Sequence, residues 1–64
     1  MEPHQQRVVD EASELEDKLT KLLAFIESNP FFTGLDATQQ GLLKAQAGAM
    51  RSYHEVLKLR IATF

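Results

Sequence analysis

Four polar side chains have the chemistry needed to recognise a phosphorylated, aromatic ligand: Arg7, Gln46, Tyr53 and Arg60. Arginine donates paired hydrogen bonds to phosphate oxygens, tyrosine stacks on a nucleobase, and glutamine reads a base edge. The same residues also have a structural interpretation, in which Gln46 sets helix register across a symmetry axis and Arg60 pairs with Glu11. Residue chemistry alone favours the structural interpretation.

Groups that could catalyse a reaction or hold a metal are not spaced to do so. His4 and His54 are fifty positions apart and belong to no metal-ligand pair. Glu11 and Glu14 fit a solvated helix face better than a proton-sharing pair, and no serine lies in a nucleophile motif. No phosphate-binding loop or dinucleotide fingerprint is present. We therefore expect a protein that is not an enzyme and that uses no metal or cofactor.

The composition of the chain limits the kinds of partner that it can bind. The chain has 64 residues, a net charge of −2 and no cysteine, so it lacks the basic surface that polymeric nucleic acid requires. No apolar run approaches a membrane span, and Glu2 and Pro3 start a signal peptide poorly, so we expect a cytoplasmic protein. A domain this small, without disulfides or a metal site, buries too little apolar surface by itself. We therefore expect the chain to bury additional apolar surface by associating with other copies of itself.

Two long helices must position the candidate side chains. Helical spacing of apolar residues predicts one all-α domain, residues 1–64, with helices over about 4–28 and 36–63 and a turn over 29–35. A connection this short makes the helices antiparallel neighbours. Such a hairpin would form a four-helix bundle as a dimer, or a larger homo-oligomer such as a tetramer.

The two helices differ in their apolar patterns. A 4-3-4-3-4 spacing in the first is typical of a coiled-coil seam: Val8, Ala12, Leu15, Leu19, Leu22 and Ile26. The second has an apolar face wider than one neighbouring helix can cover: Leu42, Leu43, Met50, Tyr53, Val56, Leu57, Ile61 and Phe64. The antiparallel register then brings Glu11 towards Tyr53, and Arg7 towards Leu57 and Arg60.

The connection between the helices is unusually apolar, with Phe31, Phe32 and Leu35 close together. We predict a hydrophobic plug that caps the end of the bundle, since exposed connections normally avoid apolar residues. The alternative is an exposed aromatic patch for a protein partner.

Small residues form a stripe along the second helix, because Gly41, Ala45, Gly48 and Ser52 recur at 4-3-4 spacing. Each glycine costs the helix roughly 0.8–1.0 kcal/mol relative to alanine, which implies a compensating contact. Close helix crossing at an oligomer interface is the favoured explanation. A shallow shelf for a flat ligand is the alternative.

The run RVVDEASELEDKLTKLLAFIESNPFF, followed by LLKAQAGAMRSYHEVLKLRI, resembles a family of very small tailed-phage proteins named after a crAss-like phage protein. The informative positions are Arg7, Glu11, Gln46, Tyr53 and Arg60. In size and hairpin design this family looks like the phage sponge proteins, which are helical oligomers that sequester cyclic nucleotide signals of host immunity.

The resemblance implies a phage-encoded homo-oligomer that captures a cyclic di- or trinucleotide in the host cytoplasm without catalysis. In that role Arg7 and Arg60 would hold phosphates, Tyr53 would stack and Gln46 would select the base. Two alternatives stay open: a module that grips and inhibits a host protein, and a purely structural oligomerisation hairpin.

Overall fold

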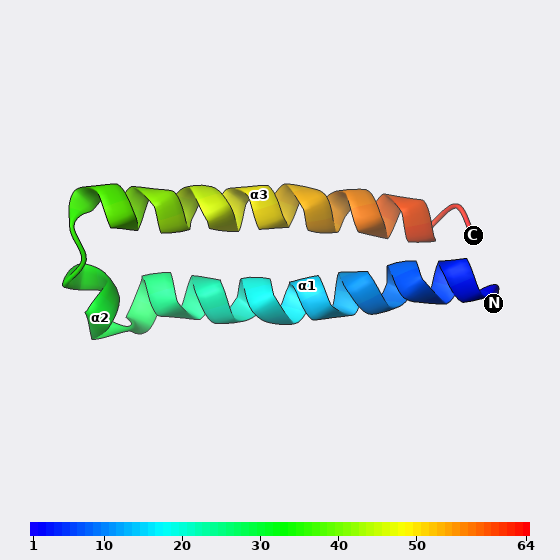
Figure 1. The fold of residues 1–64 in the computed structure, drawn as a ribbon, viewed down its shortest axis with the longest axis horizontal. Coiled ribbons are helices and arrows are strands. Elements are labelled where there is room, and N and C mark those ends of the chain that lie inside the picture. The colour runs from blue at the N-terminus through cyan, green and yellow to red at the C-terminus, as the bar shows by residue number, and fades with distance from the viewer.

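The computed structural model describes all 64 residues as a hairpin of two long antiparallel helices, α1 (Pro3–Ser28) and α3 (Ala37–Ile61). The helices run side by side, and both termini lie at the end opposite the connection (Figure 1). The molecule measures 46 × 15 × 13 Å. The predicted all-α hairpin is confirmed. None of the helices is long and apolar enough to cross a membrane.

Local sequence signals set the helix ends. The residue before Pro30 leaves the helical region, so α1 ends at Ser28 and Asn29 adopts an extended conformation. The Asp36 carboxylate accepts a hydrogen bond of 2.8 Å from the backbone N–H of Gln39 and so caps the first turn of α3.

The connection is more ordered than the predicted turn. Residues Pro30–Thr33 form one helical turn, α2, because proline suits the first helical position and the Asn29 side chain accepts a hydrogen bond of 2.9 Å from the N–H of Phe31. Gln40 then donates to the carbonyls of Phe32 and Leu35, at 3.0 Å each, and ties the connection to α3.

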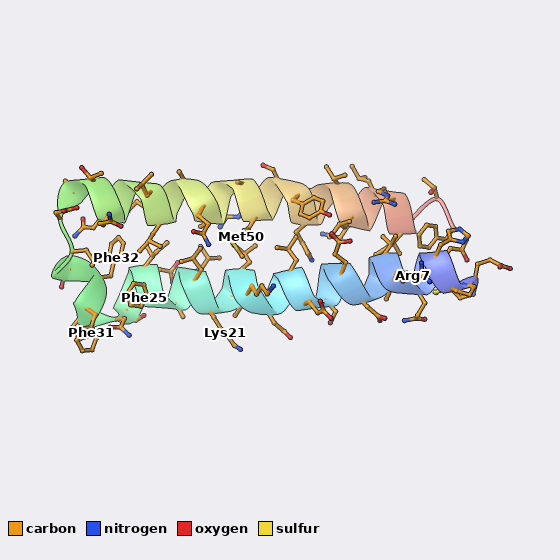
Figure 2. All side chains as sticks on the ribbon, viewed as in Figure 1. Arg7, Lys21, Phe25, Phe31, Phe32 and Met50 are labelled. Carbon is orange, nitrogen blue, oxygen red and sulfur yellow. The ribbon has the colours of Figure 1, made fainter.

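The plug prediction is right for one phenylalanine and wrong for the other. Phe32 is 6% exposed and meets Phe25 edge-on, with ring centroids 6.1 Å apart. The Lys44 ammonium lies 5.9 Å from the centroid of the Phe32 ring. Phe31 is 77% exposed and points away from the helix pair (Figure 2).

The core is a thin seam between α1 and α3. Val8, Ala12 and Leu57 form its buried cluster, with Leu15 and Ile61 packed against it. The α1 side follows the predicted 4-3 spacing. The α3 side uses the same spacing and comprises only buried or half-buried residues: Leu43, Ala47, Met50, His54, Leu57 and Ile61.

The broad apolar face expected of the second helix is therefore divided. Leu43, Met50, Leu57 and Ile61 belong to the seam, and Met50 points between the helices (Figure 2). The other four predicted members are exposed: Leu42, Tyr53, Val56 and Phe64. One neighbouring helix covers only a narrow stripe, so α1 leaves the remainder of that face open.

Candidate functional site

A hydrogen bond between side chains 42 positions apart links the two long helices. The Tyr53 hydroxyl donates to the carboxylate of Glu11. This contact confirms the predicted approach of Glu11 to Tyr53. Because the hydroxyl is held from α1 while 45% of the residue stays exposed, the ring is presented to solvent in a fixed orientation.

The Glu11 contact also changes the acidity of the phenol. The hydrogen bond to Glu11 raises the pKa of Tyr53 above its ordinary value of 10.0, and desolvation and the Glu11 charge add to this. Arg60 acts in the opposite direction through its charge, so it lies within electrostatic reach of the phenol. Tyr53 is therefore a neutral hydrogen-bond donor at physiological pH.

Two exposed arginines lie at the same end of the hairpin. Arg7 belongs to the second turn of α1 and Arg60 to the last turn of α3, and the antiparallel arrangement brings these turns together (Figure 2). The structure contains a single ion pair, Lys58 to Glu55 at 3.2 Å. The pairing of Arg60 with Glu11 is therefore wrong, because Glu11 accepts from Tyr53 instead. Both guanidinium groups are available to an anion.

Gln46 lies farther along α3. Gln46, Tyr53 and Arg60 are spaced by seven residues, which places them on one stripe at intervals of about 10.5 Å. The Gln46 side chain is exposed, and its amide N–H donates a weak hydrogen bond to the sulfur of Met50 at 3.8 Å. The structure thus places Arg7 and Arg60 at one end of the hairpin, Tyr53 two turns of α3 before Arg60, and Gln46 two turns before Tyr53.

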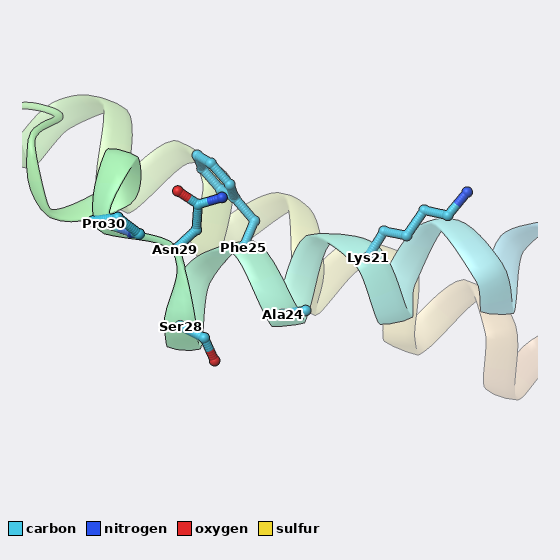
Figure 3. Close-up of a pocket in the computed structure, with 6 residues that line it drawn as sticks. All are labelled: Lys21, Ala24, Phe25, Ser28, Asn29 and Pro30. Carbon is cyan, nitrogen blue, oxygen red and sulfur yellow. The ribbon is translucent and has the colours of Figure 1, made fainter.

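The surface depression of the chain does not lie at the predicted site residues. A shallow depression of about 460 Å³, open to solvent, lies where α1 meets α2 (Figure 3). Its lining includes none of the predicted site residues: Lys21, Ala24, Phe25, Ser28, Asn29 and Pro30. Around Tyr53 a single chain offers an exposed surface and no enclosed cavity.

The small-residue stripe serves no contact inside the hairpin. A methyl group added at Gly41 or Gly48 would meet no atom within 4 Å. Both glycines lie on parts of α3 that are exposed, so α1 does not require them.

The sequence predicted Glu11 as an ion-pair partner of Arg60 or as part of a solvated helix face, whereas in the structure its carboxylate holds the Tyr53 hydroxyl. The signal that could have shown this was the antiparallel register, which already placed Glu11 across from Tyr53. No group of three or more metal-ligating side chains is present in the structure.

The fold and the exposed side chains define the class of protein. It is a small two-helix hairpin whose open surface presents a tyrosine anchored through its hydroxyl and two arginines without ion-pair partners. The family model of Sequestin matches residues 2–63, so the chain belongs to the Sequestin family. It is 43% identical over 61 residues to an uncharacterized 7.5 kDa protein of the denB-rIIB intergenic region of Enterobacteria phage T4. That alignment covers 95% of this chain and 94% of the T4 protein. No solved structure matches the chain.

The comparisons confirm the resemblance to a family of small phage proteins. The family name suggests sequestration, which is binding without turnover.

Proposed function

We propose that this protein is a phage-encoded homo-oligomer that sequesters a cyclic nucleotide immune signal in the cytoplasm of the infected cell. Its action is stoichiometric, and no residue catalyses a reaction. One observation carries the proposal: the Tyr53 hydroxyl is tied to Glu11, so an exposed ring is anchored in the half of the hairpin that also carries Arg7 and Arg60, two arginines without ion-pair partners. A preorganised aromatic surface and free guanidinium groups suit a base and a phosphate.

The charges on this surface orient the ligand. The Glu11 carboxylate repels phosphate, so the phosphates lie towards Arg7 and Arg60 while a base stacks on Tyr53. Gln46 supplies both a donor and an acceptor for the edge of a base. Small-molecule sites normally bury most of the ligand, and the open face of one chain cannot do so. We therefore place the ligand between copies of the chain.

A thermal-shift screen of the purified protein tests the proposal. The panel contains cyclic dinucleotides and trinucleotides, with the linear nucleotides as controls. A ligand present at a hundred times its dissociation constant adds about 2.7 kcal/mol, which for a small domain raises Tm by roughly ten degrees or more. We expect a rise with one or two cyclic nucleotides. A flat panel on folded protein would contradict the proposal.

Tyr53→Ala tests the site assignment with whichever cyclic nucleotide gives the largest shift. Base stacking on an aromatic side chain is worth about 1–3 kcal/mol, so we expect calorimetric affinity to fall roughly 5- to 150-fold or below detection. The oligomeric mass should not change. Phe31→Ala is the control, since it removes an even more exposed aromatic ring from the other end of the hairpin. Equal affinities for Tyr53→Ala and the unmodified protein would remove this site.

The exposed Phe31 supports a second candidate function, capture and inhibition of a host protein. Its ring is 77% exposed and adjoins Pro30, which lines the depression between α1 and α2. Phe32 is buried and takes no part. Pull-down from host lysate with the unmodified protein and with Phe31→Ser tests this function. A host protein retained only by the unmodified chain would favour it.

A further inference from the structure

α3 carries a second heptad seam that α1 does not cover. Six uncharged residues recur at 3-4-3-4-3 spacing, and every one is exposed: Leu42, Ala45, Ala49, Ser52, Val56 and Leu59. We call these six residues the outer seam. Its larger members are among the most exposed apolar residues of the chain, with Leu42 at 58%, Val56 at 50% and Leu59 at 67%. A helix with two apolar seams is typical of one packed between two neighbours.

Charge follows the same division. All charged residues of α3 except Arg60 share a single strip, outside both seams: Lys44, Arg51, Glu55 and Lys58. The outer seam therefore has the composition of a buried contact although it is exposed in the hairpin.

The exposed area of the chain indicates how much surface is uncovered. A folded monomer of 7.2 kDa should expose roughly 4,100 Å² of surface, and this chain exposes 4768 Å². The excess, about 650 Å², approaches the roughly 800 Å² that each partner buries in a standard protein–protein interface. One contact of ordinary size would remove the excess.

The surface that matches the outer seam on a second copy is its own α3. The exposed large apolar residues include none from α1, and outside α3 they are confined to Met1, Phe31 and Phe64. A seam that meets the same seam gives a two-fold contact, the commonest arrangement in homo-oligomers.

The residue sizes along the outer seam select the direction of packing. An antiparallel pair places Leu42 opposite Leu59 of the second copy, Ala45 opposite Val56, and Ala49 opposite Ser52. Large residues then meet large ones at both ends, and each valine fills the space left by an alanine. A parallel pair would place three consecutive small layers against themselves, whereas the antiparallel pair brings small residues together only where Ala49 meets Ser52, and so leaves less unfilled space.

We propose that two copies pack antiparallel through the outer seam of α3, and that this contact completes the candidate site. In this register the stripes of Gln46, Tyr53 and Arg60 from both copies lie along the same side of the helix pair. Gln46 of the second copy comes within about two residues, roughly 3 Å of helix rise, of the level of Tyr53. A base stacked on Tyr53 of one copy is therefore within reach of Gln46 from the second copy. Gln46 of the first copy lies two helical turns from that base.

The contact itself follows from the outer seam, whereas its link to a ligand rests on the proposed function. The resulting surface is two-fold symmetric, with two tyrosines and two glutamines in its centre and one Arg60 towards each end. A ligand with two bases and two phosphates matches that symmetry.

Cysteine cross-linking tests the register without any ligand, since the natural chain has no cysteine. Leu42→Cys and Leu59→Cys chains are oxidised separately and as a mixture. We expect mixed disulfide dimers from the mixture and only background cross-linking from either variant alone, because equivalent residues are about 25 Å apart in the antiparallel pair. Efficient cross-linking of Leu42→Cys with itself, or none in the mixture, would overturn the proposal.

Sedimentation of Val56→Lys tests the contact itself. We expect the unmodified chain to sediment as a dimer or a multiple of it, and Val56→Lys to sediment at half that mass with its helix content retained. Phe31→Lys places the same charge on an exposed apolar residue outside the seam and should leave the mass unchanged. An unaltered mass for Val56→Lys would refute the contact. If Val56→Lys fails to fold, Ala45→Glu, which keeps a good helix former, replaces it under the same criterion.

These results separate the two proposals. Cross-linking in the expected register together with a flat nucleotide screen would retain the contact and reject the ligand. Nucleotide binding by a chain that does not cross-link in this register would retain the ligand and reject the contact.

Discussion

Leu57→Ala should have the largest effect on stability of any single truncation along α3. Leu57 is the chain's one fully buried large side chain, at 0% exposed, and it packs against Val8 and Ala12. Truncation removes three carbon groups worth about 0.8 kcal/mol each, plus a cavity term. The hairpin is only two helices thick, so the gap can partly close, and we expect the low end of the usual range, about 3 kcal/mol.

Urea denaturation followed by circular dichroism measures this loss. With a slope of about 1 kcal/mol/M, typical of a small protein, the midpoint should fall by about 3 M. Leu59→Ala is the matched control, because the same substitution lies two residues away at a side chain that is 67% exposed. Within the hairpin it should cost less than about 1 kcal/mol.

Protein concentration separates folding from association in this comparison. Leu59 belongs to the outer seam, so any further cost of Leu59→Ala should depend on protein concentration, whereas the effect of Leu57→Ala on the hairpin should persist at every concentration. Equal losses for the two variants that do not change with concentration would refute the packing described for α1 and α3.

The acidity of Tyr53 offers a separate check, since it is the only tyrosine and the chain has no tryptophan. Because the Glu11 hydrogen bond raises the pKa of Tyr53 above 10.0, that bond stabilises the fold below pH 10 and is lost as pH rises through the folded-state pKa. Glu11→Gln should move the tyrosine absorbance titration down towards 10.0, and an unchanged titration would contradict the contact. At the connection, Phe32→Ala should cost about 3 kcal/mol or more of unfolding free energy, as expected for a buried phenylalanine. Phe31→Ala should cost little, and equal losses in urea would show that the two rings are not placed as described.

Much of the hairpin could be predicted because its signals are local. A proline after Asn29 ends one helix and an aspartate at position 36 begins the next, and both act through backbone groups a few residues away. The seam of α1 follows from helical periodicity alone. The pairing of Glu11 with Tyr53 followed from a short connection and constant helical rise.

Other features depended on competition between partners, which spacing does not encode. Phe31 and Phe32 are neighbours of the same type, and the one-turn helix α2 decides which of them turns inward. Glu11 had two predicted partners, Tyr53 and Arg60, and only the geometry of the helix pair selects the phenol. Ala47 and His54 belong to the α3 seam although neither is strongly apolar, because their positions in the heptad place them there.

The candidate site shows the same limit. The sequence by itself determined that Gln46, Tyr53 and Arg60 share a stripe, since seven residues make nearly two full turns of any α-helix. It also determined that the second helix is apolar beyond the needs of one neighbour. Tertiary structure decided how that apolar surface divides, because the contact with α1 buries one heptad seam of α3 and leaves the outer seam exposed. Helical periodicity is a property of one segment, whereas burial depends on which surfaces the chain brings together.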